Sequence, residues 1–341
     1  MKVDLNDLND FGKNILFTGA NSGIGFYSLI NLLKQENYLY VPIRSKSRRK
    51  IFLDKLQSYF DHQFLSKYLN IIEEIDFSNL ENINKIREYF LKEEKFLDII
   101  ILNAGMQYTG ALYPKVSKQG LELTFAVNHL AHFYLIQNLF SLINNSLESR
   151  IIITSSDVHN PKSSGGNVGE KASLNNLENY KDIISGKFIN FSADKAYKNS
   201  KLCNILFAKE LSKKLNHRNS KISVITWAPG LVIPDNDLGF FRYSSKFNKV
   251  GYMIFSIIAK NILGITESTK DAGNILYKIA MAKNFNNIGY LHLSNQLISY
   301  KKHKLKKINV SIEANNSELA EKLWIFSSEL CNSFGFASFD M

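Results

Sequence analysis

Residues 18–25 read Thr18-Gly19-Ala20-Asn21-Ser22-Gly23-Ile24-Gly25, between the apolar run NILFT at 14–18 and a stretch with helical spacing at 24–34. Glycines between a strand and a helix let the backbone turn tightly and approach a pyrophosphate closely. The N-terminus of the helix then presents free N–H groups and a partial positive charge to the phosphates. The alternative interpretation is a structural turn that binds no ligand. The position of the glycine-rich segment between a strand and a helix favours dinucleotide binding instead. We therefore expect cofactor contacts from Thr18, Gly19, Asn21, Ser22, Gly23, Ile24 and Gly25.

Short apolar runs alternate with helix-like segments through the first two thirds of the chain. The sequence predicts strands at 14–18, 38–43, 71–75, 98–102, 150–154 and 221–227. It predicts helices between them at about 46–60, 79–94, 118–145 and 195–217. The strands are almost continuously apolar, which is typical of a parallel sheet covered on both faces. The alternation therefore predicts an α/β fold, a Rossmann-type doubly wound parallel sheet.

Two regions break this alternation. Residues 157–192 are polar, show little periodicity and are too long for an ordinary loop, so we expect a functional insertion. After Pro229 the sequence predicts an apolar-rich stretch around 250–265, a helix near 266–282, a short strand at 289–294 and a last helix at 316–331. No linker divides the chain. We expect a single domain over 1–341, with a core at about 12–231 and a helical C-terminal extension at 232–341 that covers the substrate.

The composition fits a folded protein, because 45% of the 341 residues are hydrophobic and 21% are charged. Two cysteines argue against a disulfide scaffold and fit a reducing compartment. No run approaches the roughly 20 apolar residues that span a bilayer, and the polar N-terminus does not resemble a signal peptide. We therefore expect a cytoplasmic protein.

The segment after the second predicted strand indicates whether the site prefers NAD or NADPH. NAD-specific sites usually place an acid there, which binds the ribose 2′-hydroxyl. Residues 44–50 read RSKSRRK and contain no acid. Arg44 and a neighbouring cation can hold a 2′-phosphate through charge-assisted hydrogen bonds. A solvated first helical turn is the other interpretation, and the position in the order of elements favours NADPH.

Tyr197 and Lys201 stand four residues apart in a predicted helix. Four residues make nearly one turn, so both side chains share a face. A free tyrosine, with a pKa of about 10, is a poor acid or base at neutral pH. A lysine ammonium one turn away favours the phenolate and lowers that pKa. The pair is common by chance, and an ordinary amphipathic helix is its other interpretation.

The order of the motifs along the chain indicates what Tyr197 and Lys201 do. After the glycine turn come Asn103-Ala104-Gly105, then Asn128, then Ser156 after a strand, and then Tyr197 and Lys201. This series, from about residue 12 to 231, resembles the short-chain dehydrogenase/reductase family. The resemblance implies that the tyrosine exchanges a proton with the substrate and that the lysine tunes it and binds the nicotinamide ribose. It implies that Ser156, with Ser155 as the near alternative, orients the reacting oxygen and that Asn128 anchors a proton relay. Further cofactor contacts are implied for Asp76, Asn103, Ala104, Gly105, Tyr197, Pro229 and Gly230.

A narrower resemblance covers most of the chain. DKAYKNSKLCN at 194–204 is similar to the active-site helix of light-dependent protochlorophyllide reductases. Tyr197 follows Ser156 by 41 residues, whereas compact family members have about a dozen residues there. GNV at 166–168, LNNL at 174–177 and the last helix at 317–330 are also similar. The resemblance implies light-driven reduction of a tetrapyrrole ring double bond by NADPH, with the proton from Tyr197, in chlorophyll biosynthesis and photosynthesis.

The sequence departs from those reductases beside the expected site. Leu231 stands directly after Pro229-Gly230, where they have a cysteine implicated in pigment binding. Residues 102–105 read LNAG, the ordinary reductase form, and Val232 and Ile233 replace a frequent threonine that contacts the nicotinamide amide. One alternative is a dark reductase of an apolar carbonyl compound, similar to retinol dehydrogenases, whose helices also read KAYxxSKLxN. Another is a non-catalytic NADP-binding sensor or scaffold.

Other features have simpler interpretations. His129 and His132 flank Asn128 without a nearby acid or cysteine cluster, so we expect packing instead of a metal site. The basic run KKHKLKK at 301–307 predicts a solvated surface, because no nucleic-acid-binding fold accompanies it. The net charge of +11 suits a phosphorylated cofactor and an acidic substrate. We expect a large, apolar small-molecule substrate and no nucleic acid. The insertion at 157–192 and the apolar stretch at 250–265 are expected to form the walls of its pocket. A homo-oligomer and peripheral association with a membrane, including a photosynthetic one, stay open.

Overall fold

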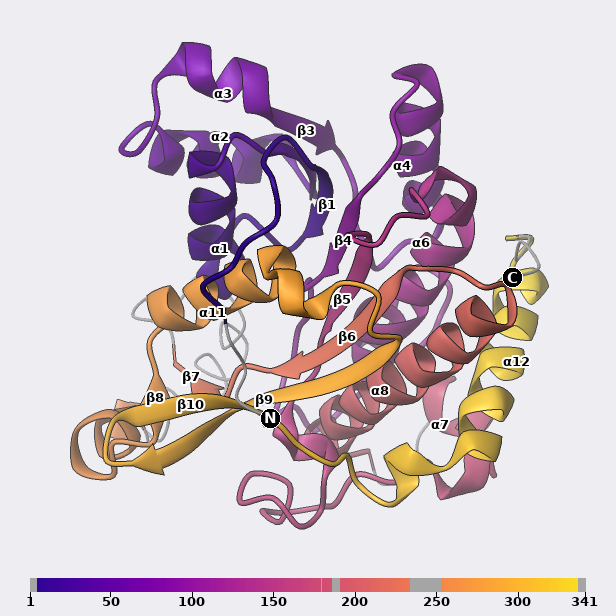
Figure 1. The fold of residues 1–341 in the computed structure, drawn as a ribbon. Helices are drawn as coiled ribbons and strands as arrows, with labels where there is room; N and C mark the ends of the chain where they lie inside the picture. The colour runs from indigo at the N-terminus through magenta and orange to yellow at the C-terminus, as the bar shows by residue number, and fades with distance from the viewer. Residues whose placement is uncertain (1–4, 179, 186–190, 234–252, 255, 337–341) are drawn as a thin grey trace.

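The computed structural model describes residues 5–178, 180–185, 191–233, 253–254 and 256–336. Its main sheet has eight strands in the order β10-β9-β6-β5-β4-β1-β2-β3 (Figure 1). The strands from β3 to β9 are parallel, and β10 is antiparallel to β9. The strands are β1 (Asn14–Thr18), β2 (Tyr38–Ile43), β3 (Leu69–Glu73), β4 (Ile99–Leu102), β5 (Arg150–Thr154), β6 (Ser223–Ala228), β9 (Tyr290–Ser299) and β10 (Lys302–Lys307). The predicted doubly wound α/β fold is confirmed.

Helices cover both faces of the sheet because successive strand side chains point to opposite sides. Ile15 and Phe17 of β1 pack against one layer of helices, and Leu16 packs against the other. The first layer holds α1 (Gly23–Lys34), α2 (Lys46–Leu56), α3 (His62–Tyr68) and α11 (Thr269–Met281). The second holds α4 (Glu81–Lys92), α6 (Ala131–Leu139), α8 (Ala193–His217) and α12 (Ser317–Ser333). The apolar strands predicted from the sequence are therefore buried on both faces.

Shorter elements connect these layers. The predicted helix at 118–145 begins at α5 (Leu123–Phe125), because the Glu122 carboxylate accepts the N–H groups of Thr124 and Phe125 at 2.8 Å each. It continues through the π-helical turn η1 (Ala126–Leu130) into α6 and η2 (Phe140–Leu142). The remaining short elements are η3 (Asp157–His159), η4 (Asn175–Leu177), α7 (Tyr180–Ile184), β7 (Leu231–Val232), η6 (Ile258–Ile262), β8 (Thr266–Glu267), η7 (Lys283–Phe285) and η8 (Glu313–Asn315). Strands β7 and β8 form a separate parallel pair.

The C-terminal region differs from the expected helical extension. β9 pairs with β6 and continues into β10, so the central sheet extends well beyond residue 231. Strand β10 was not predicted from the sequence, because five of its six residues are basic and only Leu305 is buried. Exposed lysines on an edge strand discourage pairing with other chains. Among the helices described, none is long and apolar enough to cross a membrane.

Candidate active site

The glycine turn lies tightly against the segment that follows β4. Gly19 has a φ of +70°, and a Cβ there would lie 2.7 Å from the Cα of Ala104. A Cβ on Gly25 would lie 2.2 Å from the carbonyl oxygen of Gly19. Both positions therefore require glycine. Gly25 supports the turn from beneath, whereas Gly19, Asn21, Ser22, Gly23 and Ile24 line a cavity in front of it.

Thr18 holds the turn in place and does not line the cavity. Its hydroxyl oxygen accepts the N–H groups of Asn103 at 2.9 Å and Ala104 at 3.0 Å, and the residue is fully buried. The side-chain amide of Asn103 donates to the carbonyl of Gly19 at 3.3 Å. Thr18 therefore supports the turn from the buried end of β1, where its hydroxyl faces the segment after β4. The direct cofactor contact predicted for Thr18 stays a prediction.

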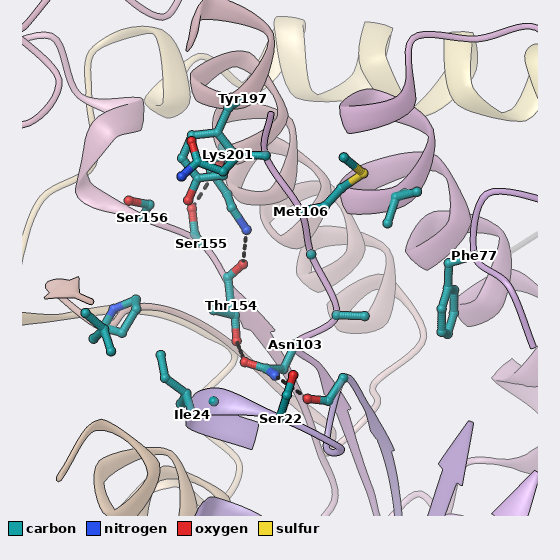
Figure 2. A pocket seen from close by; sticks show the side chains of 18 of the residues that line it. Ser22, Ile24, Phe77, Asn103, Met106, Thr154, Ser155, Ser156, Tyr197 and Lys201 are labelled. Atoms are coloured by element: carbon teal, nitrogen blue, oxygen red, sulfur yellow. Dashed lines mark hydrogen bonds between the residues drawn. The ribbon is translucent and has the colours of Figure 1, made fainter. Parts of the chain in front are cut away.

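The cavity has a volume of about 920 Å³ and lies at the carboxyl ends of the parallel strands, where ligands bind in open α/β sheets. Predicted residues that line it are Arg44, Asp76, Asn103, Ala104, Gly105, Ser156, Tyr197, Lys201, Pro229 and Gly230. Other lining residues were not predicted from the sequence, including Phe77, Ser78, Met106 and Thr269. Figure 2 shows Ser22 and Ile24 of the turn at one side and Tyr197 and Lys201 farther along.

The basic segment after β2 places two arginines on the cavity. Arg44 follows β2 directly, and Arg48 lies one turn into α2, which Ser45 caps by accepting the N–H of Arg48. Arg49 is directed elsewhere, since it pairs with Glu73 of β3 at 2.8 Å. Arg48 is therefore the neighbouring cation expected beside Arg44. These two guanidinium groups and the glycine turn fit a phosphorylated dinucleotide, because backbone N–H groups and arginines are the common ligands of phosphate.

The helix α8 brings the tyrosine and the lysine to the other end of the cavity. It begins after Ser192, whose hydroxyl accepts the N–H of Lys195 at 3.2 Å. The Lys201 ammonium lies 5.7 Å from the centre of the Tyr197 ring. Hydrogen bonding joins the Tyr197 phenol to Ser156. The predicted one-turn spacing thus places both side chains on the face of α8 that borders the cavity (Figure 2).

The two serines after β5 have different surroundings. The Ser155 hydroxyl is buried and donates to the backbone carbonyl of Lys201 at 3.0 Å. Ser156 lines the cavity beside Tyr197. His159 contacts the carbonyl of Ser156 through its Nδ1 at 2.7 Å and holds this backbone in place. Both serines line the cavity, but the Ser155 hydroxyl is engaged by the backbone, whereas that of Ser156 lies beside the Tyr197 phenol. This arrangement favours Ser156, and its role stays a prediction.

Burial has the largest effect on the pKa values of Tyr197 and Lys201. It raises the pKa of Tyr197 well above its usual range, although the hydrogen bond with Ser156 lowers it, and the Asp194 carboxylate adds to the rise. Burial also lowers the pKa of Lys201 to about 8. Burial, and not the nearby lysine, therefore determines the direction of the shift in the Tyr197 pKa, because desolvation penalises both the phenolate and the ammonium.

A chain of hydrogen bonds connects the lysine with the glycine turn. The Lys201 ammonium donates to the carbonyl of Thr154 at 3.0 Å, and the Thr154 hydroxyl donates to Oδ1 of Asn103 at 3.0 Å. The Trp227 indole N–H also donates to the Thr154 hydroxyl at 3.0 Å. Figure 2 shows this chain from Lys201 to Asn103. Thr154 was missed as a site residue, and its position at the carboxyl end of β5 was the available signal.

Asn128 lies in the π-helical turn η1 and does not line the cavity. Its Oδ1 accepts the N–H of Met106 at 2.8 Å, and its amide donates to the carbonyl of Met106 at 2.9 Å and to the Ser200 hydroxyl at 3.0 Å. It therefore fixes the segment after β4 against α8. A π-bulge of this kind often occurs at functional sites. The predicted proton relay at Asn128 stays a prediction.

His129 and His132 contact different partners. Nε2 of His129 lies 2.9 Å from the Ser327 hydroxyl of α12, and Nε2 of His132 lies 3.1 Å from the Thr18 hydroxyl. Burial lowers the pKa of each to about 3, so both rings are neutral. The contacts are those of packed core histidines. Among the described residues, no group of three or more His, Cys, Asp or Glu side chains is arranged to hold a metal ion.

Besides polar residues, the cavity is lined by several apolar side chains: Met106, Leu123, Val127, Val158, Val168 and Leu231. The insertion contributes Val158, Gly165 and Val168, while its residues 179 and 186–190 lie outside the described part. The stretch at 250–265 does not form the expected pocket wall. Residues 250–252 and 255 lie outside the described part, and none of its described residues lines the cavity. Their large side chains point to solvent.

Lys198 attaches the insertion to the catalytic helix. It is almost completely buried, and its ammonium donates to the carbonyls of Val168 and, at 2.8 Å, Glu170. The same group pairs with the Asp194 carboxylate at 2.8 Å. Because Val168 lines the cavity, this contact sets where the insertion meets the substrate end.

We expect Lys198→Met to lower the melting temperature by several degrees, since losing hydrogen bonds to a charged group costs about 1–3 kcal/mol. The affinity for the nicotinamide cofactor should change little, because Lys198 lies at the substrate end. Thermal unfolding and a cofactor titration measure both effects. Lys195→Met is the matched control, as Lys195 is more exposed and its contact with Glu170 is longer, at 3.6 Å. Equal melting temperatures for the two variants would contradict this role of Lys198.

Comparisons with known proteins agree with this arrangement. Residues 13–168 match the family model described as short chain dehydrogenase. Retinol dehydrogenase 12 of Bos taurus is 28% identical over 324 residues, which cover 95% of this chain and 88% of that protein. Retinol dehydrogenase 14 of Mus musculus is 31% identical over 232 residues, or 65% of this chain and 61% of that protein. A solved structure of an uncharacterised protein from Mycobacterium paratuberculosis has a TM-score of 0.68 at 19% identity and covers all of both chains.

The fold, the ordered motifs and these matches point to one class of protein. The N-terminal part of the chain is similar to the short-chain dehydrogenase/reductase family, and the similar curated proteins include retinol dehydrogenases.

Proposed function

We propose that this protein is an NADPH-dependent oxidoreductase that reduces an apolar carbonyl compound to an alcohol without light. The observation that carries the proposal is the meeting of Tyr197, Lys201 and Ser156 on a cavity that two arginines and several apolar side chains also line. This arrangement supports a proton donor and a phosphate site in one continuous pocket. The retinol dehydrogenase names of the relatives support the carbonyl substrate.

The residues that would hold NADPH follow from the cavity lining. The glycine turn would face the pyrophosphate with backbone N–H groups, and Asp76 would lie beside the adenine. Arg44 and Arg48 would pair with the 2′-phosphate. Lys201 and the turn at Pro229-Gly230 would face the nicotinamide end. When bound, the cofactor would supply the hydride.

The side chains of the pocket would supply the proton. Ser156 would donate a hydrogen bond to the carbonyl oxygen and orient it toward Tyr197. The raised pKa of Tyr197 keeps the phenol protonated at neutral pH, which is the form that a reduction requires. Below a pH of about 8, Lys201 would carry a positive charge that stabilises the phenolate after the transfer. The apolar lining would exclude water during the reaction.

The tetrapyrrole interpretation loses part of its support. The last helix, which motivated it, packs on the outer side of α8, where Trp324 contacts Phe133 and Phe207. The sequence similarity between this helix and that of protochlorophyllide reductases is therefore explained by residues that pack in the core. Leu231 does line the cavity, at the position where those enzymes have cysteine. The relatives favour a carbonyl substrate over a ring double bond.

A substrate panel tests the proposal. The protein is mixed with NADPH and, separately, with retinal, a long-chain aliphatic aldehyde, a small polar aldehyde and protochlorophyllide, both dark and illuminated. Absorbance of NADPH and chromatography of the products are recorded. We expect dark oxidation of NADPH with the apolar carbonyl compounds and a much slower reaction with the polar aldehyde.

Two outcomes would contradict the proposal. Chlorophyllide formed only under illumination, with no dark reduction of the aldehydes, would establish the tetrapyrrole function instead. Tight binding of NADPH with no turnover on any compound would indicate a non-catalytic sensor or scaffold.

A further inference from the structure

An unusual helix precedes β8. Residues 253–254 and 256–262 are helical, and Ala259 is its fully buried side chain. The large apolar side chains face outward: Met253, Ile254, Ile257, Ile258 and Ile262 are between 38% and 65% exposed. Residues spaced by three and four positions lie on one face of a helix, as Ile254, Ile257 and Ile258 do. A surface helix normally turns such a face to the core, so this helix presents an apolar stripe to its surroundings.

The tip of the β9–β10 hairpin extends this surface. The Tyr300 hydroxyl donates to the carbonyl of Asn261 at 2.8 Å, and the backbone N–H of Lys301 donates to the carbonyl of Gly264 at 2.9 Å. Leu297, Ile298 and Tyr300 are themselves 42–55% exposed. Figure 1 shows this hairpin and the neighbouring segment projecting together at one corner of the molecule. The two elements form one surface, here called the corner patch.

Charge accompanies the apolar side chains of the corner patch. Residues 256–265 and 295–308 contain six lysines and no acid, and Lys301, Lys302 and Lys304 are exposed beside the hairpin tip. Glu267, the first acidic residue after the helix, accepts a hydrogen bond from the Asn295 amide at 2.9 Å. Its carboxylate also lies 3.5 Å from Nδ1 of His303. An apolar stripe bordered by lysines is complementary to the interface of an anionic bilayer, where apolar side chains enter the acyl region and ammonium groups meet phosphates.

We propose that the corner patch binds this protein peripherally to the surface of an anionic lipid bilayer. The patch leads directly into β8, which pairs with β7, and Leu231 and Val232 of β7 line the cavity. Binding at this corner would therefore hold the cavity close to the membrane surface. The inference does not depend on the proposed reaction, because binding is measured without turnover.

Vesicle sedimentation tests the proposal. The full chain is mixed with vesicles of phosphatidylcholine alone or of phosphatidylcholine with phosphatidylserine, and the bound fraction is measured at low and high salt. We expect binding to the anionic vesicles that weakens at high salt. Ile254→Asp with Ile257→Asp should reduce the affinity on the order of tenfold or more, since a charge replaces each inserted side chain. Lys301→Glu with Lys304→Glu should reduce it to a similar extent.

The matched controls carry the same kinds of substitution on a surface away from the corner patch. Ile325→Asp changes an isoleucine of α12 that is 50% exposed, and Lys92→Glu with Lys95→Glu changes exposed lysines near the end of α4. These variants should bind vesicles like the unaltered protein, and circular dichroism checks that every variant is folded. The proposal is overturned if the unaltered protein binds neither kind of vesicle, or if the corner-patch variants bind as well as the controls. A dimer that sedimentation detects and Ile257→Asp dissolves, without vesicle binding, would assign the patch to a second copy instead.

Discussion

Tyr197→Phe should remove most of the turnover while leaving the fold and the binding of NADPH unchanged. The substitution deletes only the phenolic oxygen, and most of the inferred cofactor contacts come from the glycine turn, the two arginines and Lys201. Loss of a positioned proton donor costs about 10²–10⁴-fold in rate. Steady-state kinetics with the best substrate of the panel, together with a titration of NADPH by fluorescence, measure both quantities.

The control for this experiment is a tyrosine of the same helix layer that faces away from the cavity. Tyr134 of α6 is buried and donates to Asn84 at 2.7 Å, outside the cavity lining. Tyr134→Phe should therefore keep nearly normal turnover. If Tyr197→Phe reacted as fast as Tyr134→Phe, the proton would have to come from another group, and the role assigned to Tyr197 would be wrong.

Arg44→Ala combined with Arg48→Ala should weaken the binding of NADPH much more than that of NADH. The two arginines border the cavity where the 2′-phosphate is expected, and NADH lacks that phosphate. Loss of charge-assisted contacts corresponds to about ten- to a hundredfold in affinity. Dissociation constants for both cofactors, measured at one ionic strength, give the ratio directly.

Arg49 provides the matched control for the arginine pair. It belongs to the same basic segment but pairs with Glu73 on β3. Arg49→Ala should lower the affinity for both cofactors little and equally. An unaltered protein that binds NADH as tightly as NADPH would contradict the assignment of the cofactor.

The fold was predictable where local pattern and long-range packing agree. The runs at 14–18, 38–43 and 150–154 became β1, β2 and β5 with the predicted ends, because strands buried on both faces are continuously apolar. The Tyr197–Lys201 pair was predictable because helical spacing alone places both residues on one face. These features depend on neighbours in sequence.

The features that were missed depend on neighbours in space. β10 is a strand because β9 pairs with it, although its lysines suggest a solvated segment. Arg48 and Arg49 are adjacent in sequence, and only the position of Glu73 shows which of them faces the cavity. The pKa of Tyr197 follows burial more than the nearby lysine, and burial is a property of the whole fold. The apolar stretch at 250–265 predicted a pocket wall, and its described side chains lie on the surface instead.

The most direct test of the central claim follows the transferred hydrogen. The protein is incubated in the dark with an apolar aldehyde and NADPH that carries deuterium at both positions of C4 of the nicotinamide, and the alcohol is analysed by mass spectrometry. A reductase with the site described here predicts one deuterium on the former carbonyl carbon, with formation of the labelled alcohol strongly reduced in Tyr197→Phe. An alcohol without deuterium, or no alcohol from a protein that binds NADPH, would contradict the account.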